Sequence, residues 1–166
     1  MISDYYADEV YKQLYKNTCN FSNKSCLDIG TRNGANCVNL VKVGASSVVG
    51  IDIDSSRFEE MWVNKKITLL KQDLLTMDIS NKFDVITCFL WNMPYLKYNE
   101  TMNKIKELLN PDGLVYIGIV DEVYKYDPPG PYSINILELV KQHFNNTRIL
   151  DKQCVQWIIE AKNPFN

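Results

Sequence analysis

The sequence predicts an α/β fold: an open, mostly parallel seven-stranded sheet with helices on both faces and an antiparallel last strand. Three observations support this prediction. Short apolar runs alternate with amphipathic segments of helical length along most of the chain, as is typical of strand–helix–strand units. The first two runs, 26–29 and 47–52, flank a segment long enough for one helix. Near the end of the chain, two apolar segments joined by a short connection indicate a hairpin.

Length and composition favour one domain over residues 1–166, because 46% of the residues are apolar and a full core can be buried. The net charge of −2 and the pI of about 5.4 give no sign of binding to nucleic acid or to an anionic membrane. No apolar run reaches the roughly 18 residues of a membrane span, and no signal peptide opens the chain. Five scattered cysteines without a Cys-x-x-Cys pair predict reduced thiols and a cytoplasmic location.

The predicted elements follow in a regular order. An N-terminal helix covers about residues 4–17, where apolar side chains recur at helical spacing. The predicted strands are 26–29, 47–52, 67–70, 83–90, 114–120, 148–152 and 155–161. The predicted helices after the first begin at Gly34 or cover 55–62, 99–109 and 135–144. Phe58, Met61 and Trp62 are expected to face inward from the 55–62 helix, and a turn over 110–113 ends the helix that precedes it.

The turn between the first strand and its helix has the features of a ligand site. Gly30 and Gly34 border it, and a glycine lets a ligand approach the backbone and takes positive φ without strain. Amide groups at the start of the helix then point at whatever lies above the strand end. Asp52 ends the next strand, 24 residues after Asp28, where an acid can accept hydrogen bonds from both hydroxyls of a ribose.

Five motifs between about residues 25 and 118 resemble those of class I S-adenosylmethionine-dependent methyltransferases. They are Asp28-Ile29-Gly30 with Gly34, Gly50-Ile51-Asp52, Lys71-Gln72-Asp73-Leu74-Leu75, Phe83-Asp84-Val85-Ile86-Thr87-Cys88, and the Pro111-Asp112-Gly113 turn before the fifth strand. The resemblance implies an enzyme that transfers a methyl group and uses S-adenosyl-L-methionine as its cofactor. The chain departs from the family at Thr31-Arg32-Asn33, where a middle glycine is usual.

The resemblance also implies which residues bind the cofactor. Asp52 would hold the ribose, Asp73 the adenine amino group, and Leu74 would lie against the adenine face. Arg32 would either hydrogen-bond the methionine carboxylate or crowd it. For Asp73, a loop-capping role is the alternative. The predicted cofactor-binding set is Asp28, Gly30, Thr31, Arg32, Gly34, Asp52, Ile53, Asp73, Leu74 and Phe89.

A nicotinamide-dinucleotide site is the nearest alternative, followed by other α/β proteins with a glycine turn. The dinucleotide site requires Gly-x-Gly-x-x-Gly to seat a pyrophosphate, and this chain lacks that spacing. Asp28 before the turn would repel a pyrophosphate, whereas it would attract a sulfonium and an amino group. These two features favour the methyl donor.

The acceptor side of the site is predicted from segments that follow the fourth and fifth strands, with Asn92, Tyr95 and Asp121 as candidate catalytic residues. The 92–95 segment is similar to the Asn/Asp-Pro-Pro-Tyr of amino-methyltransferases. However, Met93 replaces the first proline, and Asn92 follows Asp84 by 8 residues, farther than in those enzymes. The one histidine, His143, falls in the last predicted helix, so neither a histidine base nor a metal site is expected.

The acceptor itself is not specified by the sequence, and a small molecule is favoured, with protein side chains next. An mRNA cap guanine-N7 methyltransferase is an alternative, because residues 83–118 are similar to that group, although its His-Tyr pair would fall on Met93-Pro94. A catalytically inactive cofactor-binding subunit that activates a partner protein is another, motivated by the altered turn at 31–33. A third is an enzyme that transfers an aminopropyl group from the decarboxylated cofactor.

Overall fold

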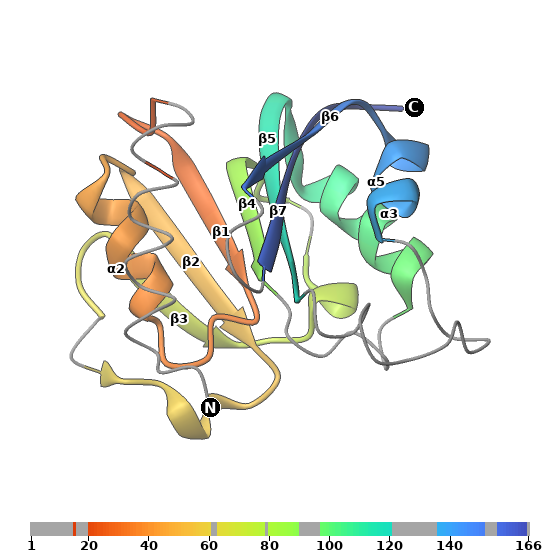
Figure 1. The fold of residues 1–166 in the computed structure, drawn as a ribbon. Helices are drawn as coiled ribbons and strands as arrows, with labels where there is room; N and C mark the ends of the chain where they lie inside the picture. Colours follow the sequence, from red (N-terminus) through yellow and green to blue (C-terminus); the bar gives the residue numbers. More distant parts are fainter. Residues whose placement is uncertain are drawn as a thin grey trace.

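A computed structural model describes residues 15, 20–60, 63–78, 80–89, 97–120, 136–151 and 156–165. Within these residues seven strands form one sheet in the order β3-β2-β1-β4-β5-β7-β6 (Figure 1). The strands are β1 (Ser25–Ile29), β2 (Ser47–Asp52), β3 (Ile67–Lys71), β4 (Phe83–Phe89), β5 (Leu109–Val120), β6 (Phe144–Asp151) and β7 (Gln156–Pro164). The helices are α2 (Ala35–Lys42), α3 (Tyr98–Leu108) and α5 (Ile136–His143), with single 3-10 turns at Ser55–Arg57 and Leu74–Thr76.

The sheet is mostly parallel, as predicted. Strand β1 lies between β2 and β4 and is parallel to both, β3 is parallel to β2, and β5 is parallel to β4. Strand β7 runs antiparallel to both of its neighbours, β5 and β6. The central strand β4 is apolar on both faces, because helices cover both sides of a parallel sheet.

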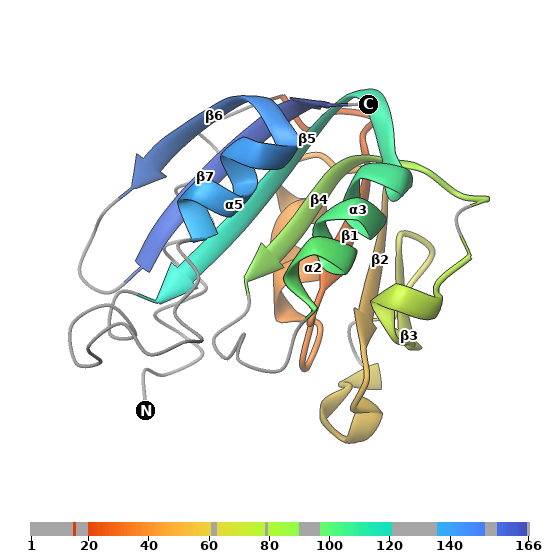
Figure 2. The ribbon, with the colours of Figure 1, turned by 90° about the vertical axis from the view of Figure 1, so that its right-hand side faces the viewer.

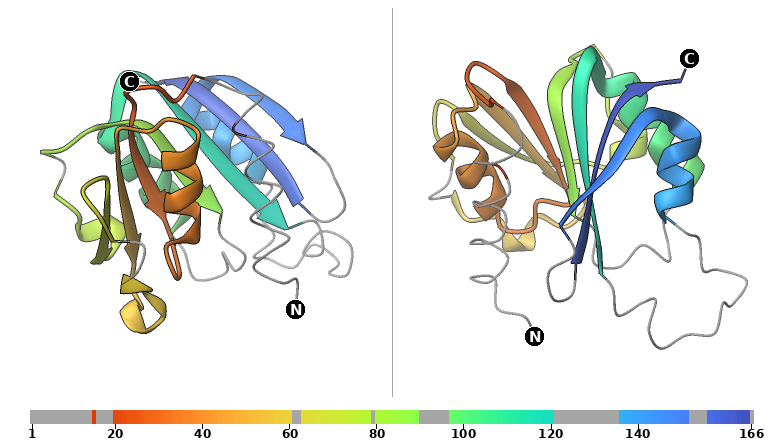
Figure 3. Two further views of the ribbon diagram at one scale, coloured as in Figure 1. Left: turned by 90° about the vertical axis from the view of Figure 1, so that its left-hand side faces the viewer. Right: turned by 45° about the horizontal axis from the view of Figure 1, so that its top comes forward.

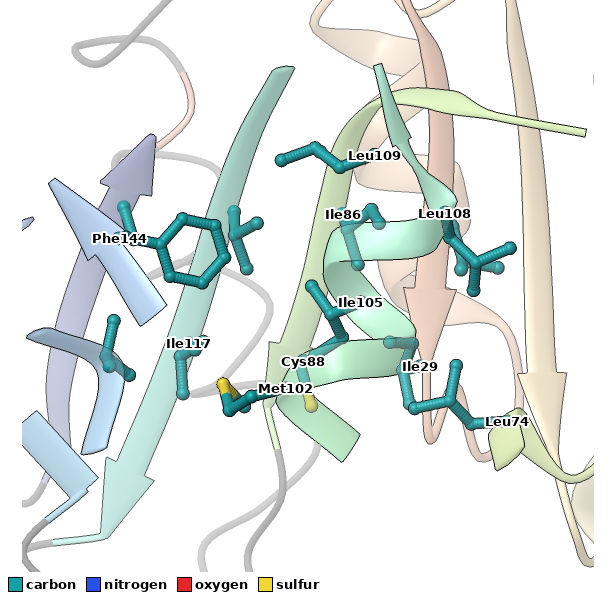
Figure 4. Close-up of a cluster of buried hydrophobic side chains, with 14 of the residues drawn as sticks. Ile29, Leu74, Ile86, Cys88, Met102, Ile105, Leu108, Leu109, Ile117 and Phe144 are labelled. Atoms are coloured by element: carbon teal, nitrogen blue, oxygen red, sulfur yellow. The ribbon is translucent and has the colours of Figure 1, made fainter. Parts of the chain in front are cut away.

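Helices cover both faces of the sheet, which confirms the predicted layers. Figure 3 shows α2 on one side, and Figure 2 shows α3 and α5 on the other. The α2 face is filled by a cluster in which Cys37 and Leu40 meet Val48 and Val85. Figure 4 shows the second cluster, in which Met102, Ile105 and Leu108 of α3 point at the sheet and meet Ile86 and Ile117. Among the described residues, no helix is long and apolar enough to cross a membrane.

The predicted helix over 55–62 is wrong. Asp54 accepts a hydrogen bond from the Ser56 amide at 2.9 Å and caps a single 3-10 turn, after which Phe58 is extended and half-buried. The chain leaves the helical path because the Glu59 amide donates to the Asn33 carbonyl oxygen at 3.3 Å, which ties this segment to the turn after β1. Met61 and Trp62 lie outside the described residues.

Strand β5 begins at Leu109, five residues before the predicted start at Leu114. Leu109 pairs with Phe83 and Leu114 pairs with Val85. The residues of the predicted turn therefore lie within β5, as an irregularity in its pairing with β4. Two features explain it. Leu109 is buried, and a Cβ at Gly113 would approach the Leu109 side chain to 2.5 Å, so only glycine fits there.

The closing strands β6 and β7 are longer than predicted and pair from Phe144 with Pro164 onward. The N-terminal helix expected over about 4–17 lies outside the described residues, apart from Tyr15, whose side chain is fully buried. A single domain over residues 1–166 stays a prediction.

Candidate functional site

The carboxyl ends of β1, β2, β3 and β4 lie along one edge of the sheet, and Figure 1 shows the arrowheads of β1 and β2 side by side there. Ile29 pairs with Ile51 on one side and with Cys88 on the other, and Asp52 pairs with Lys71. This register places the ten predicted cofactor-binding residues on the ends of four adjacent strands and on the turn and loops that follow them. Their roles in binding the cofactor stay predictions.

The turn after β1 is fastened to the end of β2 by its backbone. The amides of Gly30 and Thr31 both donate to the carbonyl oxygen of Ile51, at 2.9 and 3.0 Å. The next amide, that of Arg32, donates to Oδ2 of Asp52 at 2.9 Å. Three successive amides of the turn are therefore hydrogen-bonded to the last two residues of β2, and the turn has little freedom to move relative to Asp52.

Three residues of this turn have positive φ: Gly30 (70°), Arg32 (56°) and Gly34 (92°). Glycine takes such angles without strain, whereas a residue with a Cβ is disfavoured there by roughly 1–2 kcal/mol. Arg32 is thus a strained position in the stretch where the family usually carries a glycine. Its side chain is exposed.

Asp52 uses both carboxylate oxygens to order the backbone around it. Oδ2 accepts from the Arg32 amide, and Oδ1 accepts from the Asp54 amide at 3.0 Å. A carboxylate has about four acceptor positions, so two bonds leave capacity for further donors. Ile53, the next residue, is 71% exposed at the same edge, so its apolar side chain is accessible to a ligand there.

Asp28 lies below the turn and is only 2% exposed. Its Oδ1 accepts hydrogen bonds from the Thr87 hydroxyl at 2.6 Å and from Asn36 Nδ2 at 2.8 Å, so it joins β1 to β4 and α2. Burial raises the pKa of the Asp28 carboxyl, and the hydrogen bonds from Thr87, Thr31, Asn36 and Cys37 offset only part of that rise. This position suits a residue that stabilises the conformation of the turn.

Sequence reasoning missed a connection between the turn and the loop that follows β2. Asn33 accepts from the Ala35 amide at 3.1 Å through Oδ1, near the start of α2, and donates to Glu59 Oε1 at 3.1 Å through Nδ2. An asparagine just before a helix is a known capping signal and could have identified Asn33. Nothing near Glu59 in the sequence marks its part in this contact.

The residues after β3 show the capping geometry that was the alternative for Asp73. Asp73 is exposed, and its Oδ1 accepts from the Leu75 amide at 2.9 Å, which caps the turn Leu74–Thr76. Leu74 is 8% exposed and belongs to the core cluster of Figure 4. Contact of either residue with adenine stays a prediction.

The remaining predicted residues divide between described and undescribed parts of the chain. Phe89 ends β4 half-buried, with its ring in the space that the missing side chain of Gly118 leaves on β5. Asn92, Tyr95 and Asp121, the candidate catalytic residues, lie outside the described residues. His143 ends α5, where its Nε2 lies 3.2 Å from Asn99 Oδ1 on α3. In the described ranges, no three His, Cys, Asp or Glu side chains are grouped to hold a metal ion.

The sheet order, the antiparallel β7 and the glycine turn after β1 together define a fold of the class I methyltransferase type. A solved structure with the same fold is the N-methyltransferase NodS from Bradyrhizobium japonicum WM9, with a TM-score of 0.74 over 99% of this chain and 100% of that one. The two are 15% identical in sequence, so the likeness concerns the fold. A second structure of NodS holds S-adenosyl-l-homocysteine.

Residues 3–153 match the model of the methyltransferase domain family, and the chain belongs to that family. The predicted family and fold class are therefore confirmed. S-adenosylmethionine, the predicted cofactor, is the methyl donor of this class of enzyme.

Curated relatives match over part of the chain. A ribosomal protein L11 methyltransferase from Fusobacterium nucleatum is 32% identical over 111 residues, which are 61% of this chain and 35% of that protein. A protein from Methanocaldococcus jannaschii, provisionally named a protein N5-glutamine methyltransferase, is 35% identical over 102 residues, which are 58% of this chain and 49% of that protein. The chain thus spans half or less of the length of these relatives.

Proposed function

We propose that this protein transfers a methyl group from S-adenosylmethionine to a small-molecule acceptor. The observation that carries the proposal is the hydrogen bonding of the amides of residues 30–32 to Ile51 and Asp52 at the carboxyl edge of the sheet. Because the sulfonium is already a strong electrophile, holding the acceptor in line with the methyl group supplies most of the rate. A general base is required only when the acceptor must lose a proton early.

Each part of the edge has a role in this proposal. Gly30 lets the cofactor approach the turn, and the first amides of α2 face its methionine carboxylate with the positive end of the helix dipole. The remaining acceptor capacity of Asp52 takes the ribose hydroxyls. Asp73 takes the adenine amino group, and exposed Ile53 and the edge of Leu74 contact the adenine ring.

The acceptor class rests on charge and on the relatives. The net charge of −2 supports a small molecule over RNA, which would need clustered lysine and arginine. A protein side chain is the second candidate, because the two curated relatives at 32% and 35% identity are named as protein methyltransferases. The test incubates the protein and methyl-tritiated cofactor with a small-molecule fraction and with a protein fraction in separate reactions. The fraction that becomes labelled identifies the acceptor class. A protein that binds the cofactor but labels neither of these fractions, nor an RNA fraction, would support the alternative of an inactive subunit that activates a partner protein.

Cofactor binding is the first prediction. The purified protein should bind S-adenosylhomocysteine in calorimetry, and its melting temperature should rise with ligand concentration by mass action. Asp52→Ala should weaken binding by about tenfold or more, since hydrogen bonds to a charged group contribute about 1.5–3 kcal/mol.

Asp78→Ala is the matched control for this prediction. Asp78 is another acid that orders a turn, accepting from the Ser80 amide at 2.9 Å, but it is exposed and lies outside the predicted site. The Asp78→Ala variant should bind S-adenosylhomocysteine with the same affinity as the unaltered protein. Equal affinity in the Asp52→Ala variant would contradict the ribose role.

A further inference from the structure

Tyr15 reaches the buried acid below the turn through one intermediate side chain. Its hydroxyl donates to Asn36 Oδ1 at 2.9 Å, and Asn36 Nδ2 donates to Asp28 Oδ1 at 2.8 Å. Tyr15 and Asp28 are both almost fully buried, with 0% and 2% of their surface exposed. A residue from the chain before β1 is therefore connected by hydrogen bonds to the base of the predicted cofactor turn.

The hydrogen bonds of this chain run in one direction, from Tyr15 through Asn36 to Asp28. Asn36 presents its amino group to Asp28 and its carbonyl oxygen to Tyr15, and a carbonyl oxygen can only accept. Tyr15 must then be the donor in its own bond. Bonds arranged in this way polarise one another in a medium of low dielectric constant, so loss of one weakens the next.

Asp28 also contacts the 30–34 turn, through Cys37. The sulfur of Cys37 lies 3.8 Å from Asp28 Oδ2 and 3.2 Å from Thr31 Oγ1. The packing around this sulfur is tight, because a Cβ on Gly50 would lie 2.7 Å from it and 2.9 Å from Thr31 Oγ1. A shift of the Asp28 carboxylate would therefore displace Cys37 and, through it, Thr31, which lies in the turn itself.

We propose that Asn36 is a positioning residue for the cofactor turn and that Tyr15 sets its orientation, which makes cofactor affinity depend on this contact. The proposal rests on the proposed function, since it takes the 30–34 turn as the cofactor-binding element. It adds two residues that neither act on the substrate nor touch the cofactor in the proposal above. Their effect passes through Asp28.

Tyr116 provides an internal comparison. Its ring contacts that of Tyr15, with centroids 6.3 Å apart, and it is also fully buried. Its hydroxyl donates to Glu160 Oε2 at 3.2 Å, and Glu160 Oε1 also accepts from Arg148 Nε at 2.7 Å. The two tyrosines thus share one aromatic cluster, but only the Tyr15 hydroxyl is directed at the Asn36–Asp28 pair.

The experiment compares Tyr15→Phe with Tyr116→Phe, each of which removes a buried hydroxyl and keeps the ring. Calorimetry with S-adenosylhomocysteine should show about three- to tenfold weaker binding for Tyr15→Phe, as expected for one lost hydrogen bond. Tyr116→Phe should bind within a factor of about two of the unaltered protein, although both lower the melting temperature. Equal affinity losses in the two variants, or no loss in either, would overturn the proposal.

A second arm tests the route through Asp28. In an Asp28→Ala background, the oxygen that accepts from Asn36 is gone, so adding Tyr15→Phe should change affinity less than about twofold. An undiminished effect of Tyr15→Phe there would overturn the coupling. Asn36→Ala keeps all the aromatic rings and serves if Tyr15→Phe does not fold. It should weaken binding at least as much as Tyr15→Phe is expected to, and unchanged affinity would overturn the proposal.

Failure of the proposed function has a different signature. If the unaltered protein does not bind S-adenosylhomocysteine, the cofactor assignment is wrong and the inference falls with it. If the unaltered protein binds and only the comparison between the tyrosines fails, the proposed function stands and the positioning role is wrong.

Discussion

Two acids on neighbouring strands, Asp28 near the carboxyl end of β1 and Asp84 near the amino end of β4, are held in opposite ways. Burial dominates at Asp28 and raises its pKa above the ordinary 3.8. At Asp84 burial also acts to raise the pKa, but hydrogen bonds outweigh it, and the pKa lies below 3.8. Those bonds come from the Ser25 amide at 2.9 Å, the Ser25 hydroxyl at 3.1 Å and Asn110 Nδ2 at 2.8 Å.

The difference separates a structural end of the sheet from the proposed functional end. Asp84 joins β1, β4 and β5 in a geometry that favours its charged form, so the ionised carboxylate stabilises the fold. Asp28 and Arg32, at the other end, combine a desolvated charge with a left-handed backbone angle, and both oppose stability. Such features persist at binding sites, where geometry matters more than stability. This contrast supports placing the function at the carboxyl edge.

Asp84→Asn should have the largest effect on stability. An asparagine side chain presents one oxygen and one amino group, whereas Asp84 accepts from Ser25 on one oxygen and from Asn110 on the other. In one orientation the new amino group meets the Ser25 amide, and in the other it meets Asn110 Nδ2, so that the Asn110 amide would have to turn over to accept. We expect the free energy of unfolding at neutral pH to fall by about 2 kcal/mol, measured with urea.

Asp112→Asn, at an exposed position in the same part of β5, is the control for this variant and should change stability by less than about 0.5 kcal/mol. Because the pKa of Asp84 is lowered by folding, its stabilisation is present above pH 3.8 and is lost as the pH falls through the lower folded pKa. The difference in the free energy of unfolding between the unaltered protein and Asp84→Asn should therefore narrow in acid. A gap that is constant with pH would contradict the role of the charge.

Asp28→Asn should have the opposite sign. The amide oxygen can still accept from Thr87 and Asn36, and the amino group can face Cys37, while the desolvated charge is removed. Replacing a buried charge in this way should raise the free energy of unfolding at neutral pH by on the order of 1 kcal/mol in the same urea experiment. Asp28→Ala, in contrast, leaves two buried donors without an acceptor and should destabilise the protein.

The pH dependence of Asp28→Asn is also reversed. Folding raises the pKa of Asp28, so its contribution to stability is fully present below pH 3.8 and is lost as the pH rises through the higher folded pKa. The advantage of the variant should grow from acid toward neutral pH. If both aspartate variants follow the same trend, the contrast between the two ends is wrong.

The sequence predicted most of the fold because the signals for it are local. The bounds of β2 follow from an apolar run that ends at Asp52, and α3 follows from the helical spacing of Met102, Ile105 and Leu108. The early start of β5 could not be predicted in this way. The turn signal at 110–113 is real, but burial of Leu109 extends the strand pairing across it.

The contacts that shape the candidate site were the part that the sequence could not supply. Asp84 stood in a recognised motif, yet its partner Ser25 lies 59 residues away. Tyr15 and Asn36 are 21 residues apart, and Asn33 and Glu59 are 26 apart. Each pair depends on how separate strands and loops come together, and no spacing rule within one element describes it.

Arg32→Gly should have the smallest effect, because two opposing terms nearly cancel. Glycine relieves the positive φ of 56°, a strain of roughly 1–2 kcal/mol for a residue with a Cβ. It also loosens the unfolded chain, which lowers stability by about 0.4–1 kcal/mol. Arg32→Ala removes the side chain and keeps the strain, so the difference between the two variants isolates the backbone. We expect Arg32→Gly to be the more stable of the pair by a few tenths to about 1 kcal/mol in urea unfolding. Equal stability would mean that the turn holds no strain at this position, and the functional end would then differ from the structural end only in the charge of Asp28.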